Sequence, residues 1–192
     1  GELAILNSGI DRVEIGCLIN ASVCRDFLEP ATASLVHYNL GLHTNTLVFD
    51  ISNACLGVLN GMVHVANMIE LGQIRAGLVV AGENGGPLVD ATIKSLLNKP
   101  ELTRNEIKSS FASLTIASAA VGVLLVHKDL SKHKHRLLGG YSQAASQFNK
   151  LCRGNDESKT GVTNWSPLMK TDAETMMREG CRLAGQTWDY AK

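Results

Sequence analysis

Short runs of consecutive apolar residues alternate along the chain with longer segments of helical periodicity. Residues 13–23, 46–51 and 76–81 are mostly apolar and rich in β-branched side chains, which predicts three buried strands. Residues 54–71 lie between the second and third of these runs and predict a long helix that ends at Gly72. Strand, helix and strand in this order predict a right-handed βαβ unit with a parallel pair of strands.

The helix predicted over residues 54–71 is apolar around most of its circumference, so we expect it to be buried nearly all round. Gly57 and Gly61 stand four positions apart within it. A glycine inside a helix costs about 1 kcal/mol relative to alanine, so the pair indicates close packing against a neighbouring element. His64 lies too far along the helix to contact its first turn, and we interpret it as a hydrogen-bonded core histidine.

The rest of the chain adds helices and strands around this unit, which indicates an α/β protein with a sheet between helices. The expected helices cover residues 1–8, 30–39, 87–97, 103–110 and 171–192, and the expected further strands cover residues 114–127 and 136–143. Thr171 or Asp172 is the expected N-cap of the last helix. Residues 149–166 are expected to hold little regular structure.

Composition and charge narrow the classes of function. The 192 residues are 45% hydrophobic, and 18 basic residues balance 18 acidic ones, so no net field attracts nucleic acid. No apolar run reaches the roughly 20 residues of a membrane span. The five cysteines are odd in number and widely spaced, which argues against a disulfide framework and a zinc site. We therefore expect a cytoplasmic protein without a metal.

Both ends of the sequence fall within predicted helices, which suggests a larger structural unit. The chain does not begin with methionine, and its first residues resemble the last turns of a helix that stops at Gly9. The helical pattern of residues 171–192 is still running at Lys192. We expect this chain to be part of something longer.

The sharpest chemical feature is the segment DISNACLGVLNG, residues 50–61, which places Cys55 directly after a strand in the first turn of a helix. A nucleophile on such a turn is exposed and rigidly held. Free N–H groups at the helix start stabilise a thiolate and a developing oxyanion. Because a helix end supplies only about 0.3–1 kcal/mol, a histidine should complete the activation. The alternative is that Cys55 is a small buried core residue.

Two longer segments carry a resemblance to a known family. INASVCRDFLEPATASLVHYNLGL and TLVFDISNACLGVLNGMVHVANMIELGQIRAGLVVAGE resemble the β-ketoacyl-acyl carrier protein synthase III branch of the thiolase superfamily. The resemblance implies a five-layered α-β-α-β-α thiolase fold, present here in part, a homodimer, and a Cys55 that carries an acyl group. It makes residues 1–130 the end of the first half of that fold and residues 131–192 the start of the second. The family's N-terminal strands and its C-terminal histidine and asparagine motifs are absent.

Within that branch, two features resemble the head-to-head condensing enzymes of bacterial olefin and ketone biosynthesis. Glu29 in FLEP matches a glutamate that, in those enzymes, reaches into the neighbouring subunit and removes an α-proton. FASLTIASAAVGVLL, residues 111–125, stands where the initiating synthases have a GDGAGA-like stretch. The alternative is that Glu29 only complements the dipole of the helix that follows it.

The resemblance implies an acyltransferase that joins two fatty acyl-CoA molecules by non-decarboxylative Claisen condensation, with Cys55 as nucleophile and Glu29 as base. Such a reaction needs no cofactor beyond the thioester substrates. One alternative is a decarboxylating synthase III that uses acyl-CoA and malonyl acyl carrier protein. A catalytically silent thiolase-fold subunit and a cysteine hydrolase are further alternatives. Glu29 discriminates between the first two reactions, because only the first requires this base.

Overall fold

A computed structural model describes residues 1–25, 27, 29–133, 135–154 and 168–192. The chain divides into two compact units, each treated by itself below: Gly1–Glu83 with Ala119–Gly139, and Asn84–Ser118 with Gly140–Lys192. The predicted boundary between residues 130 and 131 concerns the halves of a thiolase fold and stays a prediction.

The first unit is built on a four-stranded sheet in the order β2-β1-β3-β4. Its strands are β1 (Ile15–Asn20), β2 (Leu47–Asp50), β3 (Ala76–Glu83) and β4 (Ala119–Val126). The first three are parallel, and β4 runs antiparallel to β3. All three predicted runs are therefore strands, but the predicted burial of the second is wrong, because β2 is an edge strand and none of its residues is buried. The predicted βαβ unit needs one correction: β1 lies between β2 and β3, so those two strands are parallel but are not neighbours.

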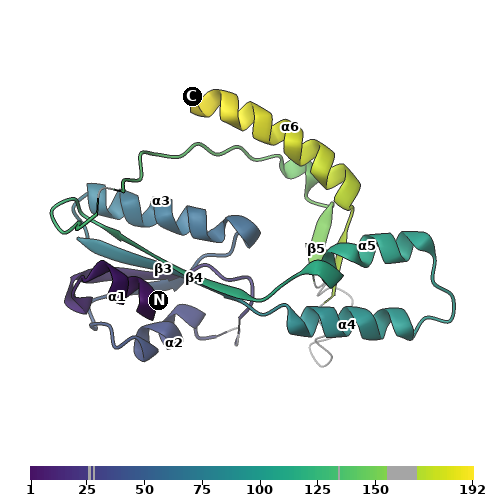
Figure 1. The fold of residues 1–192 in the computed structure, drawn as a ribbon, viewed down its shortest axis with the longest axis horizontal. Helices are drawn as coiled ribbons and strands as arrows, with labels where there is room; N and C mark the ends of the chain where they lie inside the picture. Colours follow the sequence, from purple (N-terminus) through teal and green to yellow (C-terminus); the bar gives the residue numbers. More distant parts are fainter. Residues whose placement is uncertain (26, 28, 134, 155–167) are drawn as a thin grey trace. The chain divides into compact units, whose positions relative to one another are not determined.

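Helices cover both faces of this sheet. Figure 1 shows α3 (Gly57–Glu70) on one face, and α1 (Glu2–Ser8) and α2 (Thr32–Asn39) on the other. A 3₁₀ turn, η1 (Arg12–Glu14), precedes β1. The α1 helix ends at Gly9, whose positive φ of 62° suits a residue without a side chain, as the sequence predicted.

Alternation along the central strands divides the core between these two layers. One cluster packs on the α1 and α2 side and consists of Ile5, Ile15, Leu18, Leu42, Ala76, Leu78 and Val80. The other packs on the α3 side and consists of Cys17, Ile19, Ala21, Val65, Ile69 and Val79. Side chains of successive strand residues point to opposite faces, so one apolar run supplies both clusters.

The expectation that α3 is buried nearly all round is wrong. Its buried positions recur every four residues, at Gly57, Gly61, Val65 and Ile69, and mark one face. Leu59 and Val63 on the other side are exposed, and so is His64, which is therefore not a core histidine. The sheet covers one face of a helix, and the apolar composition of α3 could not say how many faces are covered.

The second unit contains α4 (Gly86–Leu97), α5 (Arg104–Thr115), η3 (Ser146–Phe148), β5 (Cys152–Gly154), β6 (Met169–Thr171) and α6 (Ala173–Ala191). β5 and β6 form an antiparallel pair. Asp172 is the N-cap of α6 and accepts a hydrogen bond from the Thr175 N–H, as predicted. The α5 helix begins with a capping box between Thr103 and Glu106.

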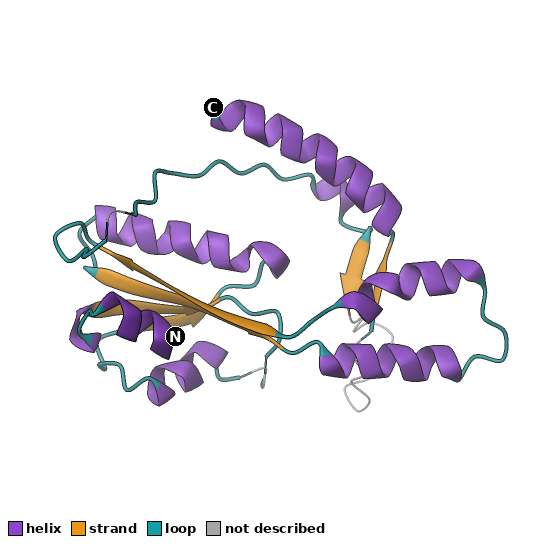
Figure 2. Ribbon diagram, in the orientation of Figure 1, coloured by secondary structure: helices purple, strands orange, loops and turns teal. Residues whose placement is uncertain are grey.

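Two predictions of regular structure fail or fall outside the structure. Residues 136–143 form no strand, and the segment that follows β4 is drawn as loop in Figure 2. A strand needs a hydrogen-bonding neighbour, and none of the described strands pairs with these residues. Of the expected excursion over residues 149–166, residues 152–154 form β5, and residues 155–166 lie outside the described residues.

Candidate active site

The candidate nucleophile lies on a sharp turn between β2 and α3. β2 ends at Asp50, and Cys55 follows in the one-turn 3₁₀ helix η2 (Ala54–Leu56), directly before α3. The Cys55 side chain is exposed. Ala54 has a φ of 43°, the left-handed region, and no other described non-glycine residue has a positive φ. A strained residue beside a strand-to-helix nucleophile is the arrangement of a nucleophile elbow.

Close packing fixes the start of α3 on the sheet. A Cβ added to Gly57 would lie 2.7 Å from the carbonyl oxygen of Ala21, and one added to Gly61 would lie 2.7 Å from Cγ1 of Val79. Both distances are shorter than any normal contact, so a side chain at either position would force the helix or its neighbour to shift. The prediction that these glycines mark close packing is confirmed. The consequence for the site is that α3, and with it Cys55, has one fixed distance from β1 and β3.

Polar side chains next to Cys55 tie the turn to the helix. The side-chain amide of Asn53 donates a hydrogen bond to Oδ1 of Asn60 on α3. His64 lies nine positions after Cys55, roughly 13 Å along a helix axis, and its Nδ1 is 3.2 Å from the carbonyl oxygen of Asn60. His64 is therefore too far from Cys55 to be the histidine that should activate it.

Glu29 lies on the segment that connects β1 to α2. Because β1 and β2 are parallel neighbours, with Asn20 opposite Asp50, the segments that follow them leave the sheet at the same edge. The Ile51 N–H donates to the carbonyl oxygen of Asn20 at 2.8 Å, so the two segments start side by side. Glu29 and Cys55 are both exposed at this edge. The catalytic roles assigned to them stay predictions.

The start of α2 bears on the alternative interpretation of Glu29. The N–H groups of Thr32 and Ala33 donate to the carboxylate of Asp50, at 3.0 Å and 2.9 Å. Asp50 thus supplies the negative charge at the helix N-terminus that the alternative assigned to Glu29. This observation weakens the purely structural interpretation of Glu29.

Sequence reasoning missed a second carboxylate at the same edge. Glu83, the last residue of β3, accepts hydrogen bonds from the N–H groups of Val23 and Cys24, at 2.6 Å and 3.1 Å. Asp50 and Glu83 both end strands, and acidic residues in that position were the available signal. Near them, Asn20 Nδ2 and Thr32 Oγ1 are buried side-chain atoms for which the described residues provide no hydrogen-bond partner.

The cysteines differ sharply in environment. Cys17 is fully buried on β1, and burial raises the pKa of its thiol from 9.0 to about 11. A thiol of this kind is a structural residue, whereas Cys55 is accessible. Within the described residues, no group of His, Cys, Asp and Glu side chains could hold a metal ion. None of the described helices is both long and apolar enough to cross a membrane.

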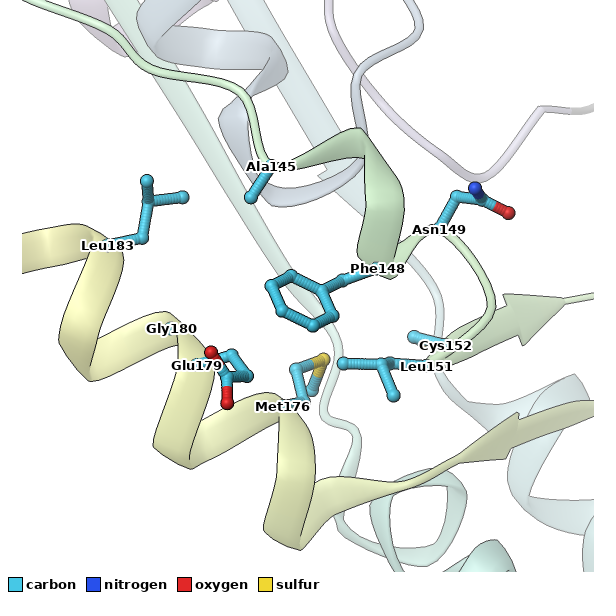
Figure 3. Close-up of a pocket in the computed structure, with 9 residues that line it drawn as sticks. All are labelled: Ala145, Phe148, Asn149, Leu151, Cys152, Met176, Glu179, Gly180 and Leu183. Carbon is cyan, nitrogen blue, oxygen red and sulfur yellow. The ribbon is translucent and has the colours of Figure 1, made fainter.

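A mainly apolar cavity of about 230 Å³ lies in the second unit, between η3 and α6. Its lining residues are Ala145, Phe148, Asn149, Leu151, Cys152, Met176, Glu179, Gly180 and Leu183. Figure 3 shows the ring of Phe148 at its centre, with the side chains of Leu151 and Met176 beside it. The carboxylate of Glu179 accepts hydrogen bonds from Arg178 and Arg182, which lower its pKa.

The mixed sheet between helices and the cysteine turn at the start of α3 together define the class of fold to which this structure is similar. They match part of the thiolase fold seen in solved structures of Xanthomonas campestris OleA, the fold that the sequence predicted. Residues 49–98, which include the Cys55 turn, match the 3-oxoacyl-[acyl-carrier-protein (ACP)] synthase III family.

Individual relatives narrow the comparison within this class. The chain is 43% identical over 190 residues to the acyl-CoA:acyl-CoA alkyltransferase of Shewanella oneidensis, covering 97% of this chain and 54% of that protein. For the enzyme of the same name from Xanthomonas campestris, identity is 37% over 189 residues, covering 98% and 53%. A β-ketoacyl-[acyl-carrier-protein] synthase III from Rhodospirillum rubrum is 24% identical over 188 residues, covering 96% and 57%.

Solved structures agree with the sequence comparison. A cysteine-to-serine variant of Xanthomonas campestris OleA with bound lauric acid and lauroyl-CoA superimposes with a TM-score of 0.86 at 37% identity, covering 98% of this chain and 53% of that one. The resemblance to the synthase III branch, and to OleA within it, is confirmed. The chain spans about half the length of the curated relatives that it matches.

Proposed function

We propose that the protein containing this chain is an acyltransferase that condenses two fatty acyl-CoA molecules without decarboxylation. The observation that carries the proposal is an exposed cysteine on a strained turn at the start of α3. Glu29 is exposed as well, and a second copy of the chain would supply it as the base. These are the two groups that the reaction requires: a nucleophile to hold one acyl chain and a base to activate the other.

The spacing of the two residues supports the assignment. Crystal structures of Xanthomonas campestris OleA include variants of one cysteine and variants of one glutamate. One of the cysteine variants holds lauroyl-CoA. The separation of that glutamate from that cysteine in sequence equals the separation of Glu29 from Cys55. Equal spacing on the same fold supports treating Glu29 and Cys55 as the counterparts of those two residues.

The proposed reaction has two stages. The Cys55 thiolate attacks the carbonyl carbon of the first acyl-CoA, the thioester bond breaks, and CoA leaves with the acyl group on Cys55. The Glu29 carboxylate of a partner subunit then takes a proton from the α-carbon of the second acyl-CoA. The resulting carbanion attacks the carbonyl carbon of acyl-Cys55, a carbon–carbon bond forms, and the Cys55 thiolate leaves, giving a 2-alkyl-3-oxoacyl-CoA.

The helix start contributes to both stages. The positive end of the α3 dipole favours negative charge at the start of the helix, on the thiolate and on the oxyanion of each tetrahedral intermediate. This contribution is about 0.3–1 kcal/mol, so a histidine is still required. Variants of one histidine of OleA were also crystallised. In OleA that histidine lies farther beyond the cysteine than this sequence extends beyond Cys55.

Several accompanying features belong to the same proposal. Neither stage changes an oxidation state, so we expect no metal or redox cofactor. A Glu29 that acts in the neighbouring site requires a homodimer. Fatty acyl-CoA is an intracellular substrate class, which fits the cytoplasmic location expected from the reduced cysteines.

The decarboxylating synthase III reaction is the second candidate, favoured by the family match over residues 49–98. It takes its carbanion from malonyl acyl carrier protein by loss of CO₂, so it needs no proton acceptor at Glu29. The two reactions therefore differ in their dependence on one residue.

The decisive experiment is intact-mass analysis of the full-length protein after addition of lauroyl-CoA, followed by product analysis. A mass gain of one lauroyl group that vanishes in Cys55→Ser supports acyl transfer. Glu29→Gln should keep this adduct but lose the condensed product. No adduct on a folded dimer would overturn the nucleophile assignment. A product that forms only with malonyl acyl carrier protein, and forms equally in Glu29→Gln, would select the second candidate.

A further inference from the structure

The segment that carries Glu29 begins as a continuation of the sheet. Beyond the end of β1, the Ala21 N–H donates to the carbonyl oxygen of Val80 at 2.7 Å. One residue later, a side chain takes over from the backbone, because the Gly82 N–H donates to Oγ of Ser22 at 2.8 Å. The Ser22 hydroxyl in turn donates to Oδ1 of Asn20 at 2.7 Å. The chain after β1 therefore stays beside the end of β3.

Glu83 extends this pairing by two further residues. Its Oε1 accepts from the Val23 N–H at 2.6 Å, and its Oε2 accepts from the Cys24 N–H at 3.1 Å. Each carboxylate oxygen thus holds one of two consecutive backbone donors. Hydrogen bonds to an ionised acceptor are shorter and roughly twice as strong as neutral ones. An amide in this position could accept at only one of its two atoms, and its NH₂ group would oppose the other N–H.

Asp50 holds the opposite end of the segment in the same way. Its two carboxylate oxygens accept from the N–H groups of Thr32 and Ala33, at 3.0 Å and 2.9 Å. Glu29 stands three residues before Thr32, so its Cα can lie at most roughly 10–11 Å from that fixed point. Two acidic side chains at the ends of strands therefore bound the positions that Glu29 can reach.

We propose that Glu83, with Asp50, is a positioning residue for Glu29: the two carboxylates hold backbone N–H groups on either side of Glu29, at residues 23–24 and 32–33, and so limit where the base acts. The proposal rests on the proposed function, because it assumes that Glu29 is the base. It assigns no contact with substrate to either carboxylate. Placement of a base matters because a displacement of about 1 Å can cost about 100-fold in rate.

The two stages of the reaction separate positioning of Glu29 from a general structural role. Acylation of Cys55 needs no base at Glu29, whereas condensation does. In full-length Glu83→Gln, the rate of acylation by lauroyl-CoA should stay within about twofold of wild type. Condensation of the pre-acylated enzyme with a second lauroyl-CoA should fall by about 10- to 100-fold. Glu83→Asp keeps both oxygens on a shorter side chain and should retain more condensation activity than Glu83→Gln.

Glu70→Gln is the matched control, because Glu70 is exposed at the end of α3, and it should leave both rates unchanged. If Glu83→Gln lowers both rates equally, its role is structural and the proposal is overturned. Unchanged condensation overturns it as well. If Glu83→Gln does not fold, Asp50→Asn tests the proposal by the same comparison of the acylation rate with the condensation rate. Glu29→Gln, measured alongside, isolates the proposed function: retained condensation there refutes the base itself, whatever Glu83→Gln does.

Discussion

Replacing Gly57 by alanine tests whether close packing of α3 sets the position of Cys55. The added Cβ would lie 2.7 Å from the carbonyl oxygen of Ala21, against about 3.4 Å for an ordinary contact. The obstacle is backbone at the end of a central strand, so it cannot rotate away. The start of α3 must therefore move by about 0.7 Å, and Cys55, two residues earlier, must move with it.

The expected cost combines two opposing effects. Overpacking of a well-packed contact destabilises by about 1–3 kcal/mol, and alanine recovers about 1 kcal/mol of helix propensity. We therefore expect Gly57→Ala to lower the free energy of unfolding by about 0–2 kcal/mol. A displaced Cys55 should slow acylation by about 10- to 100-fold. A large fall in the acylation rate with only a small fall in the free energy of unfolding indicates a misplaced nucleophile.

Urea unfolding and the rate of lauroyl transfer measured by intact mass provide the two readouts. Gly180→Ala is the control, because Gly180 lies within α6 and an added Cβ there meets nothing within 4 Å. It should stabilise the protein by about 0.5–1 kcal/mol and leave acylation unchanged. Wild-type acylation in Gly57→Ala would refute the reasoning, since it would mean that the α3–sheet contact does not fix Cys55.

Two further predictions follow from shifted pKa values. Burial raises the pKa of Cys17 to about 11, so iodoacetamide at pH 8 should modify Cys55 and leave Cys17 intact, as peptide mass mapping would show. Modification of native Cys17 at pH 8 would contradict this protection. Because the pKa of Cys17 is raised in the folded state, the free energy of unfolding should fall as pH rises from about 9 to 11. Hydrogen bonds from Lys99, and from the backbone and hydroxyl of Thr103, lower the pKa of Glu106 to about 2. The capping box should therefore stabilise α5 fully above about pH 4.5 and lose this effect as pH falls toward 2. Glu106→Gln should remove this acid-dependent component from circular dichroism titrations, and an identical acid transition in the variant would contradict the assignment.

Local signals were sufficient for the elements that carry the candidate site. The apolar runs predicted all three parallel strands, because short apolar runs rich in β-branched residues favour strands. Burial on both faces holds for the central strands β1 and β3 and not for the edge strand β2. Glycine spacing predicted the close contact of α3, because a side chain at either position would force the helix or its neighbour to shift. The change from a strand pattern to a helical pattern predicted a strand-to-helix junction at Cys55. The helix was predicted to begin at residue 54, whereas α3 begins at Gly57 and Cys55 lies in the preceding 3₁₀ turn. Each of these inferences depends on residues near one another in the sequence.

Tertiary structure decided what depends on distant partners. The position of β1 between β2 and β3 follows from hydrogen bonds between strands, which no local pattern records. The exposed side of α3 follows from a sheet that covers only one of its faces. The carboxylates of Asp50 and Glu83 show the same limit: the sequence places an acid at the end of each strand, but their backbone partners lie 17 or more residues away. Only folding brings those donors within hydrogen-bonding distance.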